Sequence, residues 1–350
     1  IAQQLVTDHN LIISFQAPED ENVVLPTETE AIEMLAAVKN EAIEAPVEEE
    51  IRTTLVENAP KAGKIRKTAY NEILGTTEWT LSNGVRVIVK PTDFKQDEIL
   101  FYATSLGGHS QVKTEDLPSA LLATDVVELA GLADMNVTDL QKALTGKRVS
   151  LSPSIGGNSE SLSGSSTVKD LETLLQLNYL YFTAPRRDEE SYQTLMSILE
   201  SQLANRDKNP KVAFNDSIQM MTSNNSERTV IFTKKLLEKV SLDKALEVYK
   251  ARFANPADFT FFFVGNVNPE DAAFKAQVCQ WLGGLKANKK KEKVVDHQVR
   301  VPLGKQQNYF TQKMETKTAS NRIQYTSYDM PYTLANDLNM GMIGRILFTR

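Results

Sequence analysis

The stretch that decides the fold is Thr80–Gly108, TLSNGVRVIVKPTDFKQDEILFYATSLGG. Its first strand, VRVIVK at 85–90, alternates valine with larger or charged residues, the period of two that is typical of a β-strand. An Asn-Gly turn signal precedes this strand and a proline ends it. The apolar run ILFYATSL at 99–106 predicts a second strand, which is closed by Gly107 and Gly108.

A helix is predicted directly after this pair of strands. Asp116 precedes Leu117 and Pro118, and a proline in the first turn is favoured at a helix N-terminus. From Ser119 to Ala133 the chain is apolar on most sides, so we expect this helix to be buried. Two strands, a double glycine and a buried helix are typical of the opening of a domain that mixes strands and helices.

The following 150 residues continue the same kind of domain. Alternating strands are predicted at 149–155 and 160–166, with a Gly-Gly-Asn turn between them, and the run FTFFFV at 259–264 is apolar enough for the centre of a sheet. Helices are predicted at 138–145, 167–182, 188–204, 212–222 and 236–253, and Pro269 is expected to open the last one. The order predicts an α+β domain whose mixed or antiparallel sheet is packed by helices on one face.

Composition bounds the function only broadly. The chain has 350 residues, a net charge of −6 and one cysteine, so it can form neither an intrachain disulfide nor a thiolate metal cluster. The charge gives no reason to expect nucleic acid as a partner. No run approaches the ~18–20 apolar residues of a membrane span. The chain lacks an initiator methionine and stops directly after an apolar helix-like run, which we interpret as a fragment of a longer protein.

The two ends of the chain are less informative than its middle. Residues 17–50 are strongly acidic, which indicates a solvated helix and linker or, alternatively, an acidic interaction arm. Residues 286–293 are basic, which indicates a solvated linker rather than a nucleic-acid patch, because no aromatic residue is interleaved. The other elements predicted here are a strand at 11–15, a helix at 26–40 with Thr27 and Glu30 as a capping box, a strand at 322–327 and a helix at 335–348.

The order of the opening elements resembles that of a domain in the insulinase/pitrilysin (inverzincin) family of zinc metallopeptidases. In that family an N-G-x-x-V strand leads to a second strand ending in Gly-Gly, and then to a zinc-binding helix with H-x-x-E-H. The corresponding helix here reads SALLATDVVELAGLAD. Thr124, Val127 and Glu128 occupy the positions of the first His, the Glu and the second His. The resemblance therefore points to the inactive repeat of the family, a conclusion that FTFFFVGNV at 259–267 also fits.

The resemblance carries expectations about fold, domains and partners. It implies a metallopeptidase-type LuxS/MPP-like domain that is complete and non-catalytic, with zinc bound by an N-terminal catalytic half outside this sequence and no cofactor in the fragment itself. The implied partners are a peptide or unfolded protein substrate and that catalytic half. The implied boundaries are 1–50 as the tail of a preceding domain, 51–77 as a connector, 78–286 as the complete domain, 287–320 as a linker and 321–350 as the start of a following, truncated domain.

The residues themselves offer no zinc site. A catalytic zinc site needs three protein ligands and an open position for water. The chain has only His9, His109 and His297, and no two of them are close enough to share a helical turn. His109 follows the glycine pair at a strand end, where it is either a loop histidine without chemistry or a contact to substrate in a cleft.

Polar residues on the predicted helix form the second candidate. Thr124, Asp125 and Glu128 fall on one helical face, which is either solvated or, by the resemblance, lines the wall of an internal cavity. Glu200, upstream of an Asn-Pro pair, is the nearest position to the third zinc ligand of the family, but it has no metal to bind without the two histidines.

We therefore expect the C-terminal, non-catalytic half of a bacterial zinc metalloendopeptidase, which forms the substrate chamber and binds peptides while zinc-activated water acts in the other half. The alternative is a proteolytically inactive structural or binding subunit of the same fold. An H-x-x-E-H motif in the few hundred residues before Ile1 would favour the peptidase. Bacterial relatives of this kind are often exported, so the periplasm or cell envelope is the expected compartment.

Overall fold

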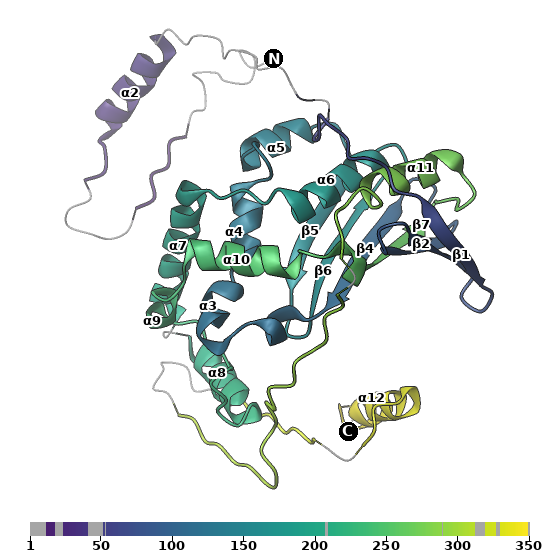
Figure 1. Ribbon diagram of the computed structural model, residues 1–350. Coiled ribbons are helices and arrows are strands. Elements are labelled where there is room, and N and C mark those ends of the chain that lie inside the picture. The colour runs from purple at the N-terminus through teal and green to yellow at the C-terminus, as the bar shows by residue number, and fades with distance from the viewer. Residues whose placement is uncertain are drawn as a thin grey trace. The chain divides into compact units, whose positions relative to one another are not determined.

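A computed structural model describes residues 12–17, 24–40, 52, 54–206, 209–288, 290–311, 319–326 and 330–348. The chain divides into two compact units, residues 1–50 and residues 51–350 (Figure 1). In the first unit, helix α2 (Glu28–Asn40) begins with the expected capping box. The Thr27 backbone N–H donates to the Glu30 carboxylate over 2.8 Å, and the Glu30 N–H donates back to Thr27 Oγ1 over 3.3 Å. The strand expected at 11–15 does not form over residues 12–15, and Leu11 lies outside the described residues.

Within the described part of the second unit, seven strands form one sheet in the order β1-β2-β3-β7-β4-β6-β5. Only β3 and β7 pair in parallel, so the sheet is mixed, and the apolar strand β7 lies at its centre as expected. The strands are β1 (Ile65–Asn71), β2 (Thr76–Leu81), β3 (Arg86–Pro91), β4 (Ile99–Leu106), β5 (Val149–Ile155), β6 (Ser159–Ser166) and β7 (Thr260–Gly265).

The alternating sequence of these strands gives the sheet one buried face. In β4 and β7 every second side chain is buried, and Phe101 contacts Phe263 with ring centroids 5.2 Å apart. Val87 and Val89 of β3 lie on the same side and are fully buried. Burial of large apolar side chains stabilises such a core by roughly 1.5–3 kcal/mol each. The period of two in the sequence therefore fixes which face the helices cover.

Helices cover that buried face: α6 packs against β5 and β6, α4 packs against β5, and α10 packs against α3 and α4 (Figure 1). The helices after β4 are α3 (Leu117–Ala120), α4 (Ala123–Ala130), α5 (Val137–Ala143), α6 (Leu171–Thr183), α7 (Glu189–Ala204), α8 (Pro210–Thr222), α9 (Lys234–Leu237), α10 (Leu242–Arg252), α11 (Ala272–Trp281) and α12 (Leu334–Phe348). No helix among the described residues is long and apolar enough to cross a bilayer. The expected α+β architecture is confirmed.

The single helix expected over Ser119–Ala133 is wrong, because the structure breaks it between α3 and α4. His109 Nε2 lies 3.3 Å from the Ala120 carbonyl oxygen at this break. In an unbroken α-helix that oxygen would accept a hydrogen bond from the backbone four residues later. A side chain from the preceding turn takes its place here, so the chain starts a new helix at Ala123.

Other boundaries also differ from the sequence expectation. The helix expected at 236–253 is two helices, because Ser241 accepts from the Lys244 backbone and caps α10. The last helix of the domain begins at Ala272 with Asp271 as its cap, not at Pro269. The strand expected at 322–327 does not form over residues 322–326, and Ser327 lies outside the described residues.

The stretch expected as a connector, 51–77, contributes to the folded domain. Strand β1 and the start of β2 belong to the sheet. The Leu55 side chain is buried, and its backbone N–H donates to Gln176 Oε1 of α6 over 2.9 Å. The Gly63 N–H donates to the Cys279 carbonyl over 2.8 Å. The sequence held no sign of the contacts of Leu55 and Gly63, because each joins residues more than 100 positions apart.

Candidate functional site

The three positions that the resemblance aligns with the zinc motif, Thr124, Val127 and Glu128, lie on helix α4. Thr124 and Glu128 are half-buried, one turn apart, whereas Val127 is fully buried with 0% of its surface exposed. Asp125 points to solvent. The position that the resemblance assigns to the general base is therefore occupied by a core side chain. Val127 packs in the main apolar cluster instead of facing a water-filled site.

Glu128 lies beside edge strand β5. Burial raises the pKa of its carboxyl group, the neighbouring Ser152 hydroxyl lowers it, and the charge of Asp125 raises it again. The carboxylate also raises the pKa of the buried tyrosines Tyr181 and Tyr249, although burial is the first cause for both. Glu128 thus connects the polar side of α4 with the serine-bearing strand β5. A single carboxylate at this place is too few ligands for a metal ion.

The described residues include no group of three His, Cys, Asp or Glu side chains that could hold a metal ion. His109 and His297 both bind backbone carbonyls, those of Ala120 and Ser110. His9 lies outside the described residues. Among the described residues, the structure therefore does not assemble Thr124, Glu128, Glu200, His109 and His297 into one metal site.

His109 is partly buried in the turn after β4, where it forms hydrogen bonds within the fold. Burial lowers its pKa, and the hydrogen bond to Ala120 partly opposes that effect. Its backbone N–H donates to the Gly156 carbonyl over 2.8 Å, and its own carbonyl accepts from Arg228 over 2.8 Å. Of the two interpretations left open by the sequence, these contacts favour a histidine that holds the turn after β4 in place.

The sheet face opposite the helices is not covered by the described part of the chain. Tyr102 of β4 is 44% exposed there, and Leu100 beside it is 49% exposed. The strand register places side chains of this face in rows that run across the sheet. One row is Glu78, Ile88, Phe262, Tyr102, Ser163 and Ser152; the next is Lys90, Val264, Leu100, Ser165 and Ser150; a third is Arg86, Thr260, Thr104, Ser161 and Ser154.

These rows divide the free sheet face into three zones. Apolar and aromatic side chains form its centre, where the Tyr102 and Phe262 rings lie 6.2 Å apart. Serine hydroxyls cover the side of β5 and β6, next to Glu128. Charged side chains lie on β2 and β3, where Arg86 pairs with Glu78 over 2.8 Å. Such a surface can contact the side chains of an extended polypeptide and donate hydrogen bonds to its backbone.

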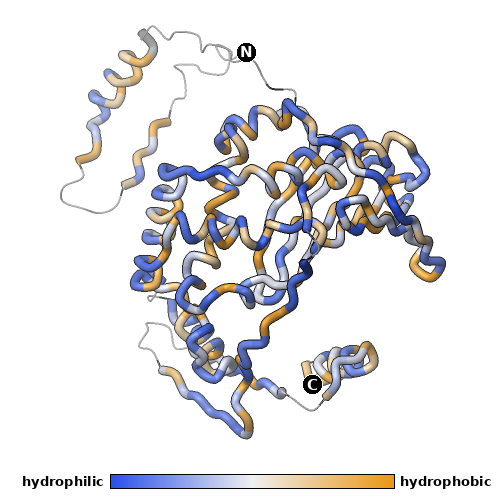
Figure 2. Tube along the Cα trace, in the orientation of Figure 1, coloured by the Kyte–Doolittle hydropathy of each residue, from blue (hydrophilic) through white to orange (hydrophobic). Residues whose placement is uncertain are grey.

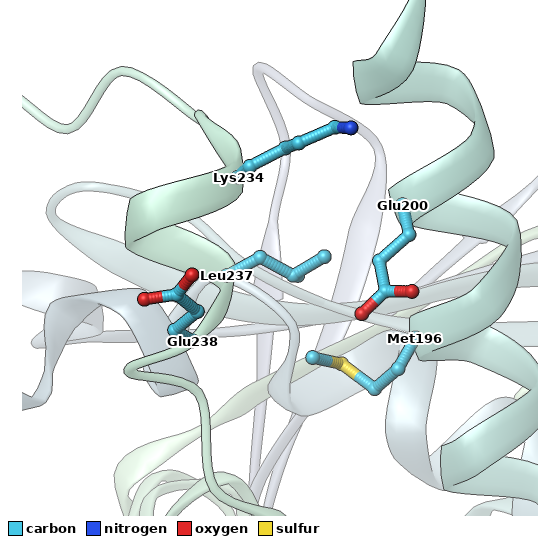
Figure 3. A pocket seen from close by; sticks show the side chains of 5 residues that line it. All are labelled: Met196, Glu200, Lys234, Leu237 and Glu238. Carbon is cyan, nitrogen blue, oxygen red and sulfur yellow. The ribbon is translucent and has the colours of Figure 1, made fainter.

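A small cavity of about 180 Å³ lies between α7 and α9, and its lining residues are Met196, Glu200, Lys234, Leu237 and Glu238. Figure 3 shows Leu237 of α9 and Met196 and Glu200 of α7 reaching into the space between the two helices, with Lys234 above them. Glu200, the position nearest to the third zinc ligand of the resembling family, is exposed in this cavity. The apolar part of its lining is Met196 and Leu237, and its charged side chains do not form a group of metal ligands.

A buried charged cluster lies under the double glycine after β4. Glu160 of β6 is 1% exposed, and its carboxylate accepts from the Gly108 N–H over 2.6 Å. Gly108 has a φ of 53°, and a Cβ there would lie 2.3 Å from the Gly156 carbonyl oxygen, so only glycine fits. Arg252, 8% exposed at the end of α10, forms an ion pair with Glu292. Burial raises the pKa of Glu160 to about 7, against the opposing effects of Gly108 and Arg252.

Glu292 belongs to a segment that the sequence assigned to a solvated linker. We call residues 290–297 the strap. Two of its backbone N–H groups bind the domain. The Glu292 N–H donates to the Asp258 carboxylate over 2.8 Å, and the Val295 N–H donates to Ser110 Oγ over 3.1 Å. The His297 imidazole contacts the Ser110 carbonyl over 2.7 Å. Most residues of the strap are exposed, as expected of a solvated linker, but these contacts also attach it to the folded domain.

Replacing Glu160 with glutamine should change how stability depends on pH. Because the pKa of Glu160 is higher in the folded chain than its ordinary value of 4.5, the folded state favours the neutral carboxyl. The protonated Glu160 carboxyl therefore contributes to the free energy of unfolding. This contribution is complete below about pH 4.5 and is lost as pH rises to about 7. Glutamine stays neutral and keeps an oxygen for Gly108. Between pH 4.5 and 8 we expect Glu160→Gln to gain up to ~3 kcal/mol of unfolding free energy relative to the wild type.

Chemical denaturation across this pH range measures the effect. Glu172→Gln, at an exposed position on α6, is the matched control and should leave the pH dependence unchanged. Equal pH dependence for the wild type and Glu160→Gln would show that the Glu160 carboxyl is not protonated preferentially in the folded chain.

The amino-acid sequence is similar to those of known zinc proteases. No model of a protein family matches the sequence. A zinc protease PQQL-like protein of Arabidopsis thaliana is 29% identical over 251 residues, which are 71% of this chain and 24% of that protein. The probable zinc protease PqqL of Escherichia coli is 24% identical over 210 residues, 60% of this chain and 22% of that protein. The chain thus spans about a quarter of the length of these relatives.

Solved structures share the fold. The crystal structure of the periplasmic protease PqqL from Escherichia coli matches 79% of this chain and 30% of its own, with a TM-score of 0.63 and 22% identity. A peptidase M16 inactive domain from Pseudomonas fluorescens matches 63% of this chain and 53% of its own, with a TM-score of 0.50 and 18% identity. From the sequence relationship over 251 residues and this common fold, we conclude that the chain is a homologue of the M16 (pitrilysin/PqqL) zinc proteases.

Proposed function

We propose that this chain is the non-catalytic C-terminal part of an M16 zinc metalloendopeptidase, in which it forms one wall of the substrate chamber and binds peptide or unfolded protein. The observation that carries the proposal is the free sheet face, with its apolar centre and its border of hydroxyls. Zinc would be held by the other half of the full-length protein. This part would confine and orient the substrate, which contributes to catalysis without touching the reacting bond.

The polar flank of α4 extends this binding surface. Glu128 lies beside Ser152, so the degenerate helix meets the free sheet face at strand β5. Asp125 is exposed on the same helix. We infer that Asp125 and Glu128 face the chamber and repel acidic substrate segments, whereas His109 supports the turn beneath them.

Two substitutions at the apolar centre test this role. In the full-length protein, Tyr102→Ser with Phe262→Ser removes two ring surfaces that a bound peptide would cover. We expect about tenfold weaker binding of a fluorescent unstructured peptide rich in leucine and phenylalanine, which corresponds to ~1.4 kcal/mol. Fluorescence anisotropy measures the dissociation constant.

Tyr309→Ser is the control, because Tyr309 is 87% exposed and lies outside the sheet. Near-ultraviolet circular dichroism should show that the double variant keeps its native packing. Unchanged peptide affinity in a folded double variant would refute a substrate-binding role for this face.

A proteolytically inactive structural or binding subunit is the alternative. The burial of Val127 at the position of the general base fits either reading, since both lack a zinc site in this domain. The sequence before Ile1 separates them: an H-x-x-E-H motif in the longer polypeptide supports the peptidase, and its absence supports the subunit.

We also propose export to the periplasm or cell envelope of a bacterium. The support is a single likeness, the Escherichia coli protease whose structure is described as periplasmic. Fractionation of cells that express the full-length gene, with detection of the protein in the osmotic-shock fluid, tests this compartment.

A further inference from the structure

The strap is attached to two turns of the folded domain. At its start the Lys290 carbonyl accepts from Asn255 Nδ2 over 2.6 Å, beside the turn before β7. Further along, Gln111 Nε2 of the turn after β4 donates to the Lys293 carbonyl over 2.5 Å. In Figure 2 the strap is hydrophilic except for one short apolar stretch, as its sequence KKEKVVDH requires. Its two valines are 38% and 44% exposed, so polar contacts rather than apolar burial hold the strap.

One of these polar contacts is an ion pair at a buried place. Arg252 pairs with Glu292 of the strap, and their side chains are only 8% and 24% exposed. Both charged groups lie against the double glycine, because a Cβ on Gly107 would lie 2.8 Å from Arg252 Nη1 and 3.1 Å from Glu292 Oε2. The next residue, Gly108, donates its N–H to the buried Glu160 carboxylate. Two carboxylates and one guanidinium therefore meet around this double glycine.

The two carboxylates carry like charge when both are ionised, so each opposes the other. The pKa of Glu160 is raised to about 7, first by burial and also by the charge of Glu292, whereas the Gly108 N–H and Arg252 lower it. Coupling of this kind is reciprocal. If the strap carboxylate disfavours ionised Glu160, then ionised Glu160 disfavours the attached strap by the same factor. Attachment is therefore firmest while Glu160 is neutral and weakens as pH rises through about 7.

Other charged groups surround the strap. The Asp258 carboxylate accepts a backbone N–H of the strap and lies 4.0 Å from Lys291. His297 of the strap contacts a carbonyl of the turn after β4, and the His109 carbonyl in that turn accepts from Arg228. Burial lowers the pKa of His109. All of these groups are the same in the wild type and in a Glu160 variant, so a comparison of the two proteins at one pH isolates the Glu160 charge.

We propose that the strap is a pH-sensitive latch, which stays on the two turns while the Glu160 carboxyl is neutral and detaches more often once that carboxyl is charged. Detachment releases residues 290–297 from the domain, so pH controls how firmly the chain that follows α11 is tied to it. The latch does not depend on zinc, on proteolysis or on the substrate role of the free sheet face.

Hydrogen exchange in the 350-residue chain tests the latch. The readout is a peptide over residues 290–297, which contains the Glu292 and Val295 amides that the domain binds. We expect this peptide to exchange about fivefold faster in the wild type than in Glu160→Gln at pH 8. At pH 5 the two proteins should exchange equally, because position 160 is then neutral in both. Each comparison is made at a single pH, so the intrinsic pH dependence of exchange cancels.

Two controls separate strap detachment from unfolding of the domain. A peptide over β7, at the centre of the sheet, should exchange far more slowly than the strap in both proteins. Glu172→Gln, at an exposed position, should leave strap exchange unchanged. Equal strap exchange in the wild type and Glu160→Gln at pH 8, or a strap that exchanges only as fast as β7, would overturn the proposal.

The reciprocal effect gives a second test. Glu292→Gln removes a charge that raises the pKa of Glu160, so that pKa should fall. Carbon-13 NMR of the Glu160 carboxyl, followed from pH 4 to pH 9, measures it. Glu270→Gln, at an exposed position that pairs with Lys275, is the control and should leave the pKa of Glu160 unchanged. An unchanged or higher pKa of Glu160 in Glu292→Gln would contradict the latch. Because no readout uses peptide binding, such a failure leaves the chamber role standing.

Discussion

Replacing Arg252 with methionine is expected to destabilise the domain by about 3–5 kcal/mol at pH 8. The guanidinium forms an ion pair with Glu292 of the strap, and its positive charge lowers the pKa of the buried Glu160 carboxyl. Methionine keeps most of the aliphatic packing of arginine but leaves Glu160 buried without a countercharge. An uncompensated buried charge is far more damaging than the loss of the ion pair itself.

The loss should be smaller at pH 5. With a pKa of about 7, Glu160 is largely protonated there and needs no partner. Arg187→Met is the matched control: Arg187 pairs with Asp243 over 2.8 Å, but both side chains are at least half exposed, so we expect a much smaller loss of stability than for Arg252→Met. Urea denaturation of both variants at the two pH values measures the difference. A loss for Arg252→Met that equals the control at pH 8 would contradict the role assigned to this cluster.

Restoring the missing general base is expected to damage the fold and not to create an enzyme. Val127→Glu places a carboxyl where the side chain is 0% exposed, and a buried carboxyl without partners is expected to reduce stability by about 3–5 kcal/mol. The loss should grow as pH rises, because burial raises the pKa of such a group and ionisation in the core is unfavourable. Thermal unfolding at pH 5 and pH 8 measures it.

Thr124→His serves as the control on the same helix. Thr124 is half-buried, so the larger side chain has access to solvent and should change stability by about 1 kcal/mol or less. A stable triple variant, Thr124→His with Val127→Glu and Glu128→His, that takes up zinc would show instead that α4 retains the geometry of a metal site.

The sequence predicted the sheet well because its signals are local. Alternation at 85–90 and 149–155, and the apolar run at 259–264, each identify a strand from adjacent residues, and all three strands form with nearly those bounds. The capping box of Thr27 and Glu30 is local in the same way. Strand β1 was missed because IRKTAYN exposes both sides and carries no alternation of apolar residues.

The features that depend on distant partners could not be predicted. The break between α3 and α4 depends on His109, which reaches Ala120 from the preceding turn. The strap looks like a solvated basic linker, because nothing in its sequence shows that Glu292 meets Arg252, 40 residues earlier. The same reason explains why the sequence did not point to Glu160, the buried carboxyl of β6 that accepts a hydrogen bond from the turn after β4. One faint signal was present: Glu160 is a lone acid in the serine-rich run NSESLSGSS.

We propose that this homologue of zinc proteases binds no catalytic metal itself and that proteolysis depends on another part of a longer polypeptide. The most direct measurement is the zinc content of the purified chain, incubated with zinc, desalted and analysed by mass spectrometry of the elements, together with a peptide-cleavage assay. We predict no stoichiometric zinc and no cleavage, with both gained in the full-length protein. One tightly bound zinc per chain, or cleavage by the chain alone that a chelator abolishes, would contradict the account.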